Sequence, residues 1–185
     1  MRKESTMTAA NTSGFPRPKV VLVGPPGAGK STVGRRLAKA LNVGLVDSDD
    51  LLSAAYGKPC GEVFSELGED GFRDVEPRYV REALRSDGVV SLGGGAVLSA
   101  ANRAMLAGHT VVHIDVSAEE GVRRTAGDTN RPVLAADDRL AHYRGLLDER
   151  EQYSREVAGF RARTDGRGPQ QVVGDILGYL DTRQP

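Results

Sequence analysis

One run of residues restricts the fold of this chain more than any other, Gly24-Pro-Pro-Gly-Ala-Gly-Lys30-Ser31. It matches the pattern G-x-x-x-x-G-K-[ST] at every fixed position, and it follows the apolar run Lys19–Val23. Glycines let backbone N–H groups turn inward around phosphate oxygens, and a helix that begins beside them adds its positive end. The alternative is a glycine-rich turn with an incidental lysine. A strand before the loop and an amphipathic helix after it favour a phosphate-binding loop.

The loop assigns a nucleotide role to each of its residues. Lys30 is expected to reach the β- and γ-phosphates, where it acts in catalysis, and the Ser31 hydroxyl is expected to ligate Mg²⁺. Thr32 adds a hydrogen bond to the α-phosphate. The predicted ATP-binding residues of the loop are Gly27, Ala28, Gly29, Lys30, Ser31 and Thr32. The reaction stays open at this point, because such loops serve kinases, ATPases and GTPases alike.

Short apolar runs alternate with amphipathic stretches along the rest of the chain. The predicted strands are Lys19–Val23, Val43–Val46, Val89–Leu92, Thr110–Ile114 and Phe160–Arg163. The predicted helices are Lys30–Leu41, Glu69–Leu84, a helix opened by a capping box of Ser117 and Glu120, Arg139 to about Arg150, and a closing helix from Pro169 to Leu180. This alternation predicts an α/β fold, with a parallel sheet covered by helices on both faces.

Length and composition bound the domain organisation. A chain of 185 residues fits one domain, which we expect at 19–182, after a polar and disordered N-terminal extension at 1–18. Residues 126–138 lack an apolar pattern and are expected to form a mobile loop. The 25 basic and 25 acidic residues leave no net charge, which argues against a nucleic-acid partner. A single cysteine, Cys60, and the absence of a long apolar run or a secretory signal favour a reduced, cytoplasmic setting without a membrane segment.

Two further features narrow the class of enzyme. The chain has no N-K-x-D motif of the kind that reads guanine, and it is too short for a motor domain, so a small phosphoryl-transfer kinase remains.

Asp47 and Asp49 follow a predicted strand, where two carboxylates can hold Mg²⁺ through water and orient an acceptor hydroxyl. The alternative is a helix N-cap, for which Asp49 or Asp50 would serve. Gly93–Gly95 also follows a strand, and indicates either close backbone approach to a ligand or a flexible turn. The residues alone thus predict an ATP kinase whose acceptor is unknown, and isolated arginines are most often solvated.

The motifs together resemble the shikimate kinase family, and most closely its actinobacterial members. The resemblance runs from about Lys19 to Leu180. It rests on Gly24–Thr32, Asp47-Ser-Asp49, Gly68-Glu69, Phe72-Arg73 with Glu76, Ser91-Leu-Gly-Gly-Gly95, Arg131-Pro-Val-Leu134, and Tyr143, Arg150 and Tyr153 in that order. It implies a three-layer fold of the nucleoside-monophosphate-kinase type, with a five-stranded parallel sheet and a mobile lid at about 126–138. It also implies transfer of the γ-phosphoryl of ATP to the 3-hydroxyl of shikimate, on the route to chorismate and the aromatic amino acids.

The resemblance further implies site residues. Arg73 and Arg150 would clamp the shikimate carboxylate, with Glu76 orienting Arg73. Asp49 would position the nucleophilic hydroxyl, and Asp47 would hold Mg²⁺ through water. The remaining implied contacts are the backbone of Gly93, Gly94 and Gly95 with the substrate, Arg131 in the lid with the transferring phosphoryl, and Arg124, Pro132 and Arg167 with the adenine of ATP.

Two other interpretations are kept beside this one. A gluconate kinase of the same fold would share Lys30 and Ser31 but should lack Phe72-Arg73 and Gly93–Gly95. A regulatory nucleotide-binding module without catalysis would usually have lost a phosphate-loop or carboxylate residue. No dimerisation stripe is visible, so a monomer that binds shikimate and ATP is the expectation.

Overall fold

In the computed structural model, which describes residues 16–128 and 137–183, β1 (Val20–Val23) is buried along its whole length. Val20 and Leu22 pack into one apolar cluster of the core, and Val21 and Val23 pack into another. A strand whose alternate side chains all meet apolar neighbours must be covered on both faces. The uninterrupted apolar run before the phosphate loop therefore reflects a strand at the centre of a layered fold.

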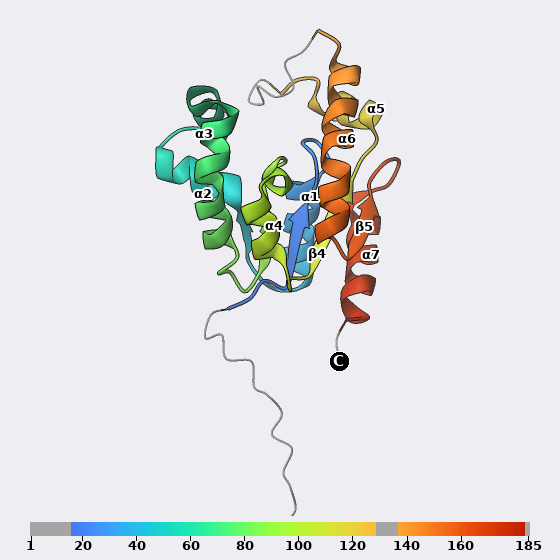
Figure 1. The fold of residues 1–185 in the computed structure, drawn as a ribbon. Helices are drawn as coiled ribbons and strands as arrows, with labels where there is room; N and C mark the ends of the chain where they lie inside the picture. The colour runs from blue at the N-terminus through green and yellow to red at the C-terminus, as the bar shows by residue number, and fades with distance from the viewer. Residues whose placement is uncertain (1–15, 129–136, 184–185) are drawn as a thin grey trace, which may run out of the picture.

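The other elements surround this strand (Figure 1). The remaining strands are β2 (Leu45–Asp47), β3 (Val89–Ser91), β4 (Val111–Asp115) and β5 (Phe160–Arg163). The helices are α1 (Lys30–Ala40), α2 (Ser48–Tyr56), α3 (Cys60–Ala83), the short 3-10 turn η1 (Ala96–Leu98), α4 (Ala100–Leu106), α5 (Ala118–Thr125), α6 (Arg139–Val157) and α7 (Pro169–Asp181). Within the described residues, the five strands form one parallel sheet in the order β2-β3-β1-β4-β5.

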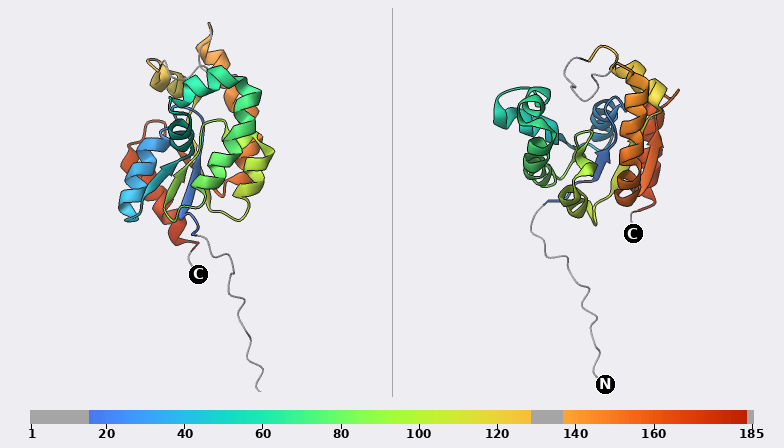
Figure 2. Two further views of the ribbon diagram at one scale, coloured as in Figure 1. Left: turned by 90° about the vertical axis from the view of Figure 1, so that its left-hand side faces the viewer. Right: turned by 45° about the horizontal axis from the view of Figure 1, so that its top comes forward.

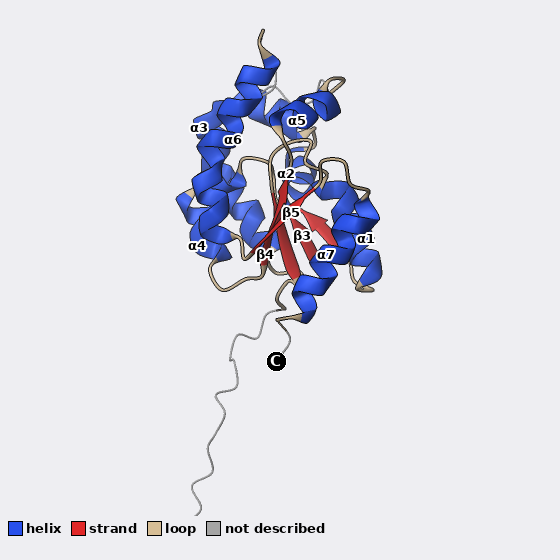
Figure 3. Ribbon diagram, turned by 90° about the vertical axis from the view of Figure 1, so that its right-hand side faces the viewer, coloured by secondary structure: helices blue, strands red, loops and turns tan. Residues whose placement is uncertain are grey.

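Helices cover both faces of the sheet. Figure 3 shows α1 and α7 on one side of the strands and α3, α4 and α6 on the other. The prediction of a parallel sheet flanked by helices is confirmed. β1 lies between β3 and β4. After β1 the chain forms β2 and β3 on one side of this strand, and it then forms β4 and β5 on the other side. Open parallel sheets bind ligands beyond the carboxyl end of a strand at such a switch point, and here the phosphate loop occupies that position.

Several predicted boundaries change in the structure. The helix expected at Glu69–Leu84 is the second part of α3, because Gly68 takes a non-helical conformation and kinks the helix before it. The helix expected to end near Arg150 continues to Val157. Three helical segments were not predicted: α2, the part of α3 before Gly68, and α4.

The capping box at the start of α5 is only half formed. The Ser117 hydroxyl accepts from the Glu120 N–H at 3.3 Å, as predicted. The Glu120 carboxylate instead accepts from Arg123 and Arg124, and the Ser117 N–H donates to the Asp165 carboxylate. The reciprocal half of the prediction is wrong because a longer-range carboxylate takes the N-cap donor.

The N-terminal extension and the lid fall largely outside the described residues. The described part of the extension is 16–18, where Arg17 donates to the Gly108 carbonyl at 2.7 Å and so ties this stretch to the domain. The lid residues 129–136, with Arg131 and Pro132, lie outside the described part of the chain. Among the helices that the structure describes, none is long and apolar enough to span a bilayer.

Candidate active site

The phosphate loop joins β1 to α1 and is held in its curve by its own lysine. The Lys30 ammonium donates to the carbonyl oxygens of Gly24 at 2.6 Å and Pro25 at 3.1 Å. Gly29 is the N-cap of α1 in the left-handed region, at φ 97°, and no side chain caps the helix there. The first N–H groups of α1 therefore point toward the loop with no side-chain acceptor from the N-cap, which is the arrangement that binds phosphate.

A cavity of about 580 Å³ opens beside this loop. It brings together most of the predicted site residues from five separate parts of the chain. Its lining includes Gly27, Gly29, Lys30, Ser31, Thr32, Asp47, Asp49, Arg73, Glu76, Gly93, Gly94, Gly95 and Arg150. Ala28 belongs to the loop, but it is fully buried and does not line the cavity. Arg73 lies on α3 and Arg150 lies on α6. The ribbons of these two helices stand apart in Figure 1 and in the right-hand view of Figure 2, although Figure 3 shows both on the same side of the sheet.

Arg150 on α6 is the most unusual residue of this cavity. Only 6% of the residue is exposed, and its Nε and Nη1 atoms have no hydrogen-bond partner among the described residues. Burial, and then the nearby charge of Arg73, lower the pKa of Arg150 from its ordinary value. A buried guanidinium without a partner is costly, so such a group indicates a site for an anion.

Arg73 on α3 is held by a carboxylate on one side only. Its Nη1 donates to both carboxylate oxygens of Glu76 at 3.0 Å, which confirms the predicted contact between these two residues. Its buried Nε has no partner among the described residues, and its Nη2 lies 3.9 Å from Glu69, beyond hydrogen-bond distance. Arg73 therefore keeps donors available for a ligand while one edge of the guanidinium is fixed.

The three glycines after β3 are explained by side chains that press against them. A Cβ at Gly93 would lie 2.5 Å from Asp49 Oδ1, and one at Gly94 would lie 2.9 Å from Pro26. A Cβ at Gly95 would overlap the Arg73 guanidinium. Larger residues would displace the functional side chains themselves, so the glycines are needed because of protein groups and not only for the approach of a ligand.

Asp47 caps the helix that follows it. Its Oδ1 accepts from the Asp49 N–H at 2.8 Å, so Asp47 is the N-cap of α2. The alternative that assigned the cap to Asp49 or Asp50 is wrong in its residue, because the helix begins at Ser48, two or three residues before the start that those caps imply. The pKa of Asp49 is raised by burial and by the charge of Asp47, and Lys30 acts against this rise.

Cys60 lies against Asp49 in the same cavity wall. Burial and the nearby Asp49 raise the pKa of the Cys60 thiol above its usual range, so the thiol stays protonated and donates to the carboxylate. From the sequence, Cys60 was used only to infer a reduced setting, and this contact was not predicted. The contact joins the first residue of α3 to the first turn of α2.

The two arginines predicted at the adenine are placed differently from each other. Arg124 donates to the Thr164 hydroxyl at 2.9 Å. It also donates to the Gly27 and Ala28 carbonyls at 3.4 and 3.3 Å, so it stabilises the backbone of the phosphate loop. Arg167 pairs with Asp175 at 2.7 Å. Neither residue lines the large cavity.

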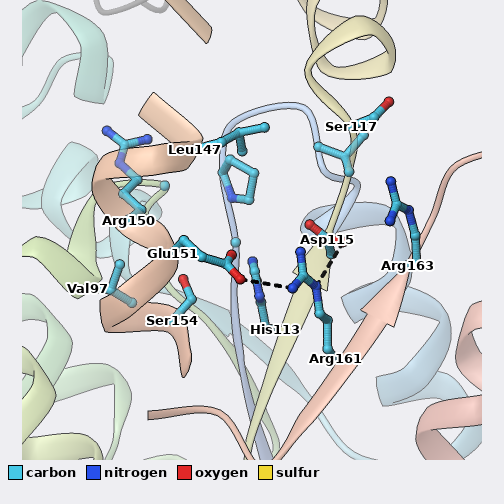
Figure 4. A pocket seen from close by; sticks show the side chains of 14 residues that line it. Val97, His113, Asp115, Ser117, Leu147, Arg150, Glu151, Ser154, Arg161 and Arg163 are labelled. Atoms are coloured by element: carbon cyan, nitrogen blue, oxygen red, sulfur yellow. Dashed lines mark hydrogen bonds and ion pairs between the residues drawn. The ribbon is translucent and has the colours of Figure 1, made fainter. Parts of the chain in front are cut away.

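A second, smaller cavity of about 170 Å³ lies behind the phosphate loop (Figure 4). Arg161 bridges Asp115 and Glu151 in its wall, with 3.0 Å to each carboxylate. His113 also lines it, and burial lowers the pKa of this imidazole, which favours the neutral form at neutral pH. Arg150 lines both cavities, but its guanidinium points away from the Arg161 network in Figure 4.

Comparison with known proteins places this geometry in a family. The family model described as Shikimate kinase matches residues 26–181, which is most of the chain. The chain belongs to the shikimate kinase family. It is 64% identical to the shikimate kinase of Corynebacterium efficiens over 165 residues, covering 89% of this chain and 98% of the relative. It is 53% identical to that of Mycobacterium tuberculosis over 169 residues, covering 91% and 96%.

Solved structures agree with the family. A shikimate kinase from Acinetobacter baumannii, solved in complex with shikimate, superposes with a TM-score of 0.86 at 34% identity, covering 91% of this chain and 95% of that one. A gluconokinase from Sinorhizobium meliloti superposes with a TM-score of 0.58 at 21% identity, covering 91% and 93%. At that identity the second likeness shows the fold alone. The alternative of a gluconate kinase is therefore not supported.

Two further residues make contacts at this site that were not predicted from the sequence. The Tyr143 hydroxyl donates to the Pro26 carbonyl in the phosphate loop, so α6 contacts the loop directly. Asn102 on α4 donates to Glu76 and to the Ala96 carbonyl. Tyr143 stood in the motif without a stated role, and Asn102 carried no signal, because nothing in a single sequence marks a buried amide.

Proposed function

We propose that this chain transfers the γ-phosphoryl group of ATP to the 3-hydroxyl of shikimate, giving shikimate 3-phosphate and ADP. A bond forms between the hydroxyl oxygen and the γ-phosphorus, the bond from that phosphorus to the oxygen of ADP breaks, and the hydroxyl proton is released. The product is an intermediate on the route to chorismate and the aromatic amino acids. The observation that carries the proposal is the buried Arg150, which lies in the same cavity as the phosphate loop and whose Nε and Nη1 have no hydrogen-bond partner in the part of the chain that the structure describes.

The substrate end of the cavity suits a carboxylate. Arg73 and Arg150 reach it from α3 and α6, each with buried donor atoms that lack a protein acceptor among the described residues. Guanidinium groups bind a planar carboxylate through paired N–H donors, and the repulsion between two such groups is relieved when an anion lies between them. Shikimate has one carboxylate, whereas its hydroxyls would face the Gly93–Gly95 turn and Asp49.

Asp49 stands between the substrate end and the phosphate loop. Its carboxylate would accept a hydrogen bond from the reacting hydroxyl and hold that oxygen toward the γ-phosphorus. Lys30 follows at the loop, where its ammonium would stabilise the negative charge that gathers on the transferring group. The ring hydroxyl, the carboxylate and the phosphates would thus each meet a separate protein group.

Magnesium fits the acidic end of this site. The Ser31 hydroxyl and the Asp47 carboxylate line the same cavity, and the described residues contain no cluster of three or more His, Cys, Asp or Glu side chains that could hold a metal. Mg²⁺ commonly binds through one or two protein oxygens, with water and substrate phosphates completing its shell. When bound, it would neutralise charge on the β- and γ-phosphate oxygens.

The nucleotide end of the site remains a set of proposals. Arg124 and Arg167 would contact the adenine, and Arg131 and Pro132, which lie outside the described residues, would close over the phosphates. We also propose a monomeric protein in the cytoplasm, with neither a nucleic-acid nor a membrane partner. Light scattering of the purified protein would test the monomer directly.

The first prediction concerns the reaction. We expect ADP release that depends on shikimate and is abolished when EDTA removes Mg²⁺, with no ADP release above background for gluconate or AMP. A coupled assay of ADP with the three acceptors in parallel makes the measurement. Turnover with gluconate or AMP but not with shikimate would contradict the proposal.

The second prediction concerns Arg150. Arg150→Met keeps an unbranched apolar stem and removes the charged guanidinium, so we expect shikimate affinity to fall by about thirtyfold or more, which corresponds to about 2 kcal/mol. ATP affinity should stay nearly constant, because the carboxylate belongs to shikimate. Since a buried charge without a partner is replaced by an apolar group, the melting temperature should not fall. Calorimetric titration with each ligand makes the measurement.

The matched control for Arg150 is Arg155, an exposed arginine on the same helix, whose guanidinium pairs with Glu151 at 2.8 Å. Arg155→Met should change neither affinity. If the Arg150 variant lost ATP affinity as much as shikimate affinity, the assignment of a carboxylate clamp would be wrong.

A further inference from the structure

Asn102 is buried at the junction of three elements that surround the substrate arginine. It is the third residue of α4 and has no exposed surface. Its side-chain amide donates to Glu76 Oε2 on α3 at 3.3 Å and to the Ala96 carbonyl in η1 at 2.9 Å. Both N–H donors of the amide are thus used, one toward each neighbouring element.

The first of these contacts fixes the carboxylate that fixes Arg73. Glu76 is 2% exposed, and both of its oxygens accept from Arg73 Nη1. Burial raises the pKa of Glu76, while Arg73 and then Asn102 favour its ionised form. A carboxylate that receives donors from two directions has little rotational freedom, so Asn102 sets the plane in which Glu76 presents its oxygens.

The second contact fixes the opposite side of the same guanidinium. Ala96 directly follows Gly95, and Arg73 Nη2 packs so closely on Gly95 that a Cβ there would overlap it. A shift of the Ala96 carbonyl would therefore move the surface against which Arg73 rests. One amide thus holds both the carboxylate on one side of Arg73 and the turn on the other.

The geometry points to Asn102 as a positioning residue for the reaction: its amide holds Glu76 and the Gly93–Ala96 turn at a fixed separation, and this separation aims Arg73 at the substrate carboxylate. Asn102 does not line the cavity, so it acts only through its neighbours. The inference rests on the proposed function, because it requires that Arg73 bind the carboxylate of shikimate.

Two substitutions test this role. Asn102→Leu keeps approximately the size of the side chain and removes all polarity. Asn102→Asp keeps its shape, places a carboxyl group beside Glu76 and leaves at most one O–H donor for the two acceptors. Because each variant loses at least one of the two hydrogen bonds, we expect KM for shikimate to rise about tenfold. We expect kcat and KM for ATP to stay within about twofold, because the amide bonds the turn at Ala96, beyond the two glycines, Gly93 and Gly94, that pack on Asp49 and Pro26.

Ser99→Ala is the matched control. Ser99 caps α4, and its hydroxyl accepts from the backbone N–H of Asn102 at 3.3 Å without touching Glu76. Loss of this cap should lower the melting temperature of the protein by a few degrees and leave KM for shikimate unchanged. If Asn102 merely supported α4, the Asn102 variants and Ser99→Ala would change KM for shikimate by the same factor.

A double-mutant cycle shows whether the effect passes through Glu76. In a Glu76→Ala background, the Asn102 substitutions should change shikimate affinity by no more than about twofold, since the carboxylate that the amide holds is gone. An undiminished effect in that background would overturn the inference, as would equal changes in both Michaelis constants or the failure of both Asn102 variants to fold. A wild-type protein inactive toward shikimate would overturn the proposed function instead, before any variant is compared.

Discussion

Lys30→Ala is expected to reduce kcat by at least about a hundredfold while the fold stays intact, because Lys30 stabilises charge that develops during transfer. The Lys30 ammonium donates to the Gly24 and Pro25 carbonyls at 2.6 and 3.1 Å. These two hydrogen bonds hold the positive charge at the loop. The substitution therefore removes a preformed electrostatic group, and the melting temperature should change by only a few degrees.

The matched control is Lys39, which is an exposed lysine in the last turn of the same helix. Lys39→Ala removes the same charge from α1 without affecting the loop, so kcat should remain at the wild-type value. Steady-state kinetics with saturating shikimate, together with thermal melting of each variant, make the comparison. Near-normal kcat for Lys30→Ala would refute the assignment of the phosphate loop as the catalytic nucleotide site.

The phosphate loop and the sheet could be predicted because their signals are local. Residues Gly24–Ser31 are contiguous, and the apolar strands owe their composition to burial on both faces, which a sequence records directly. The second part of α3 was predictable for the same reason, since its buried residues recur at helical spacing. Five strands in a parallel sheet followed from the alternation of these patterns.

The helices that were missed are short and owe their stability to tertiary contacts. α2 buries only Ser48 and Leu52, and Leu52 packs against Val63 and Phe72 on α3. α4 has seven residues, and the two that it buries are Asn102 and Leu106. A buried polar residue breaks the apolar period on which prediction depends, so a helix of this kind gives no signal.

Burial of charge was equally invisible in the sequence. Arg150 lies on α6, where charged residues surround it in the chain, and nothing local distinguishes it from the exposed Arg155. Its role was implied by family resemblance alone, and the structure supplies the physical reason, a guanidinium without a protein acceptor among the described residues. The contact between Cys60 and Asp49 depends on how α2 packs against α3, which no spacing rule reports.

Asp49→Asn is expected to reduce kcat by about a hundredfold or more. The amide cannot take up the hydroxyl proton, and its uncharged oxygen is a weaker hydrogen-bond acceptor for the reacting hydroxyl. Shikimate affinity should fall by a smaller factor, since Arg73 and Arg150 still bind the carboxylate. Nucleotide affinity should stay close to that of the wild type. The exposed Asp50, in the same first turn of α2, provides the control, because Asp50→Asn makes an equal change in the charge near the helix N-terminus.

Asp49→Asn should leave the free energy of unfolding equal or higher at neutral pH. This result would separate a functional carboxylate from a structural one. Burial raises the pKa of Asp49 in the folded protein above its value in the unfolded chain, so the folded state binds more protons in the interval between the two values. The ionised carboxylate therefore costs stability, and this cost grows as pH rises through that interval and stays in full above it. A neutral amide does not carry the cost, so the melting temperature of Asp49→Asn relative to wild type should increase with pH across the same interval. Thermal melts at several pH values, beside kcat for both variants, make the measurement. A variant that keeps its activity would show that Asp49 does not position the nucleophile. A variant that loses stability at neutral pH as well as activity would show that Asp49 supports the fold.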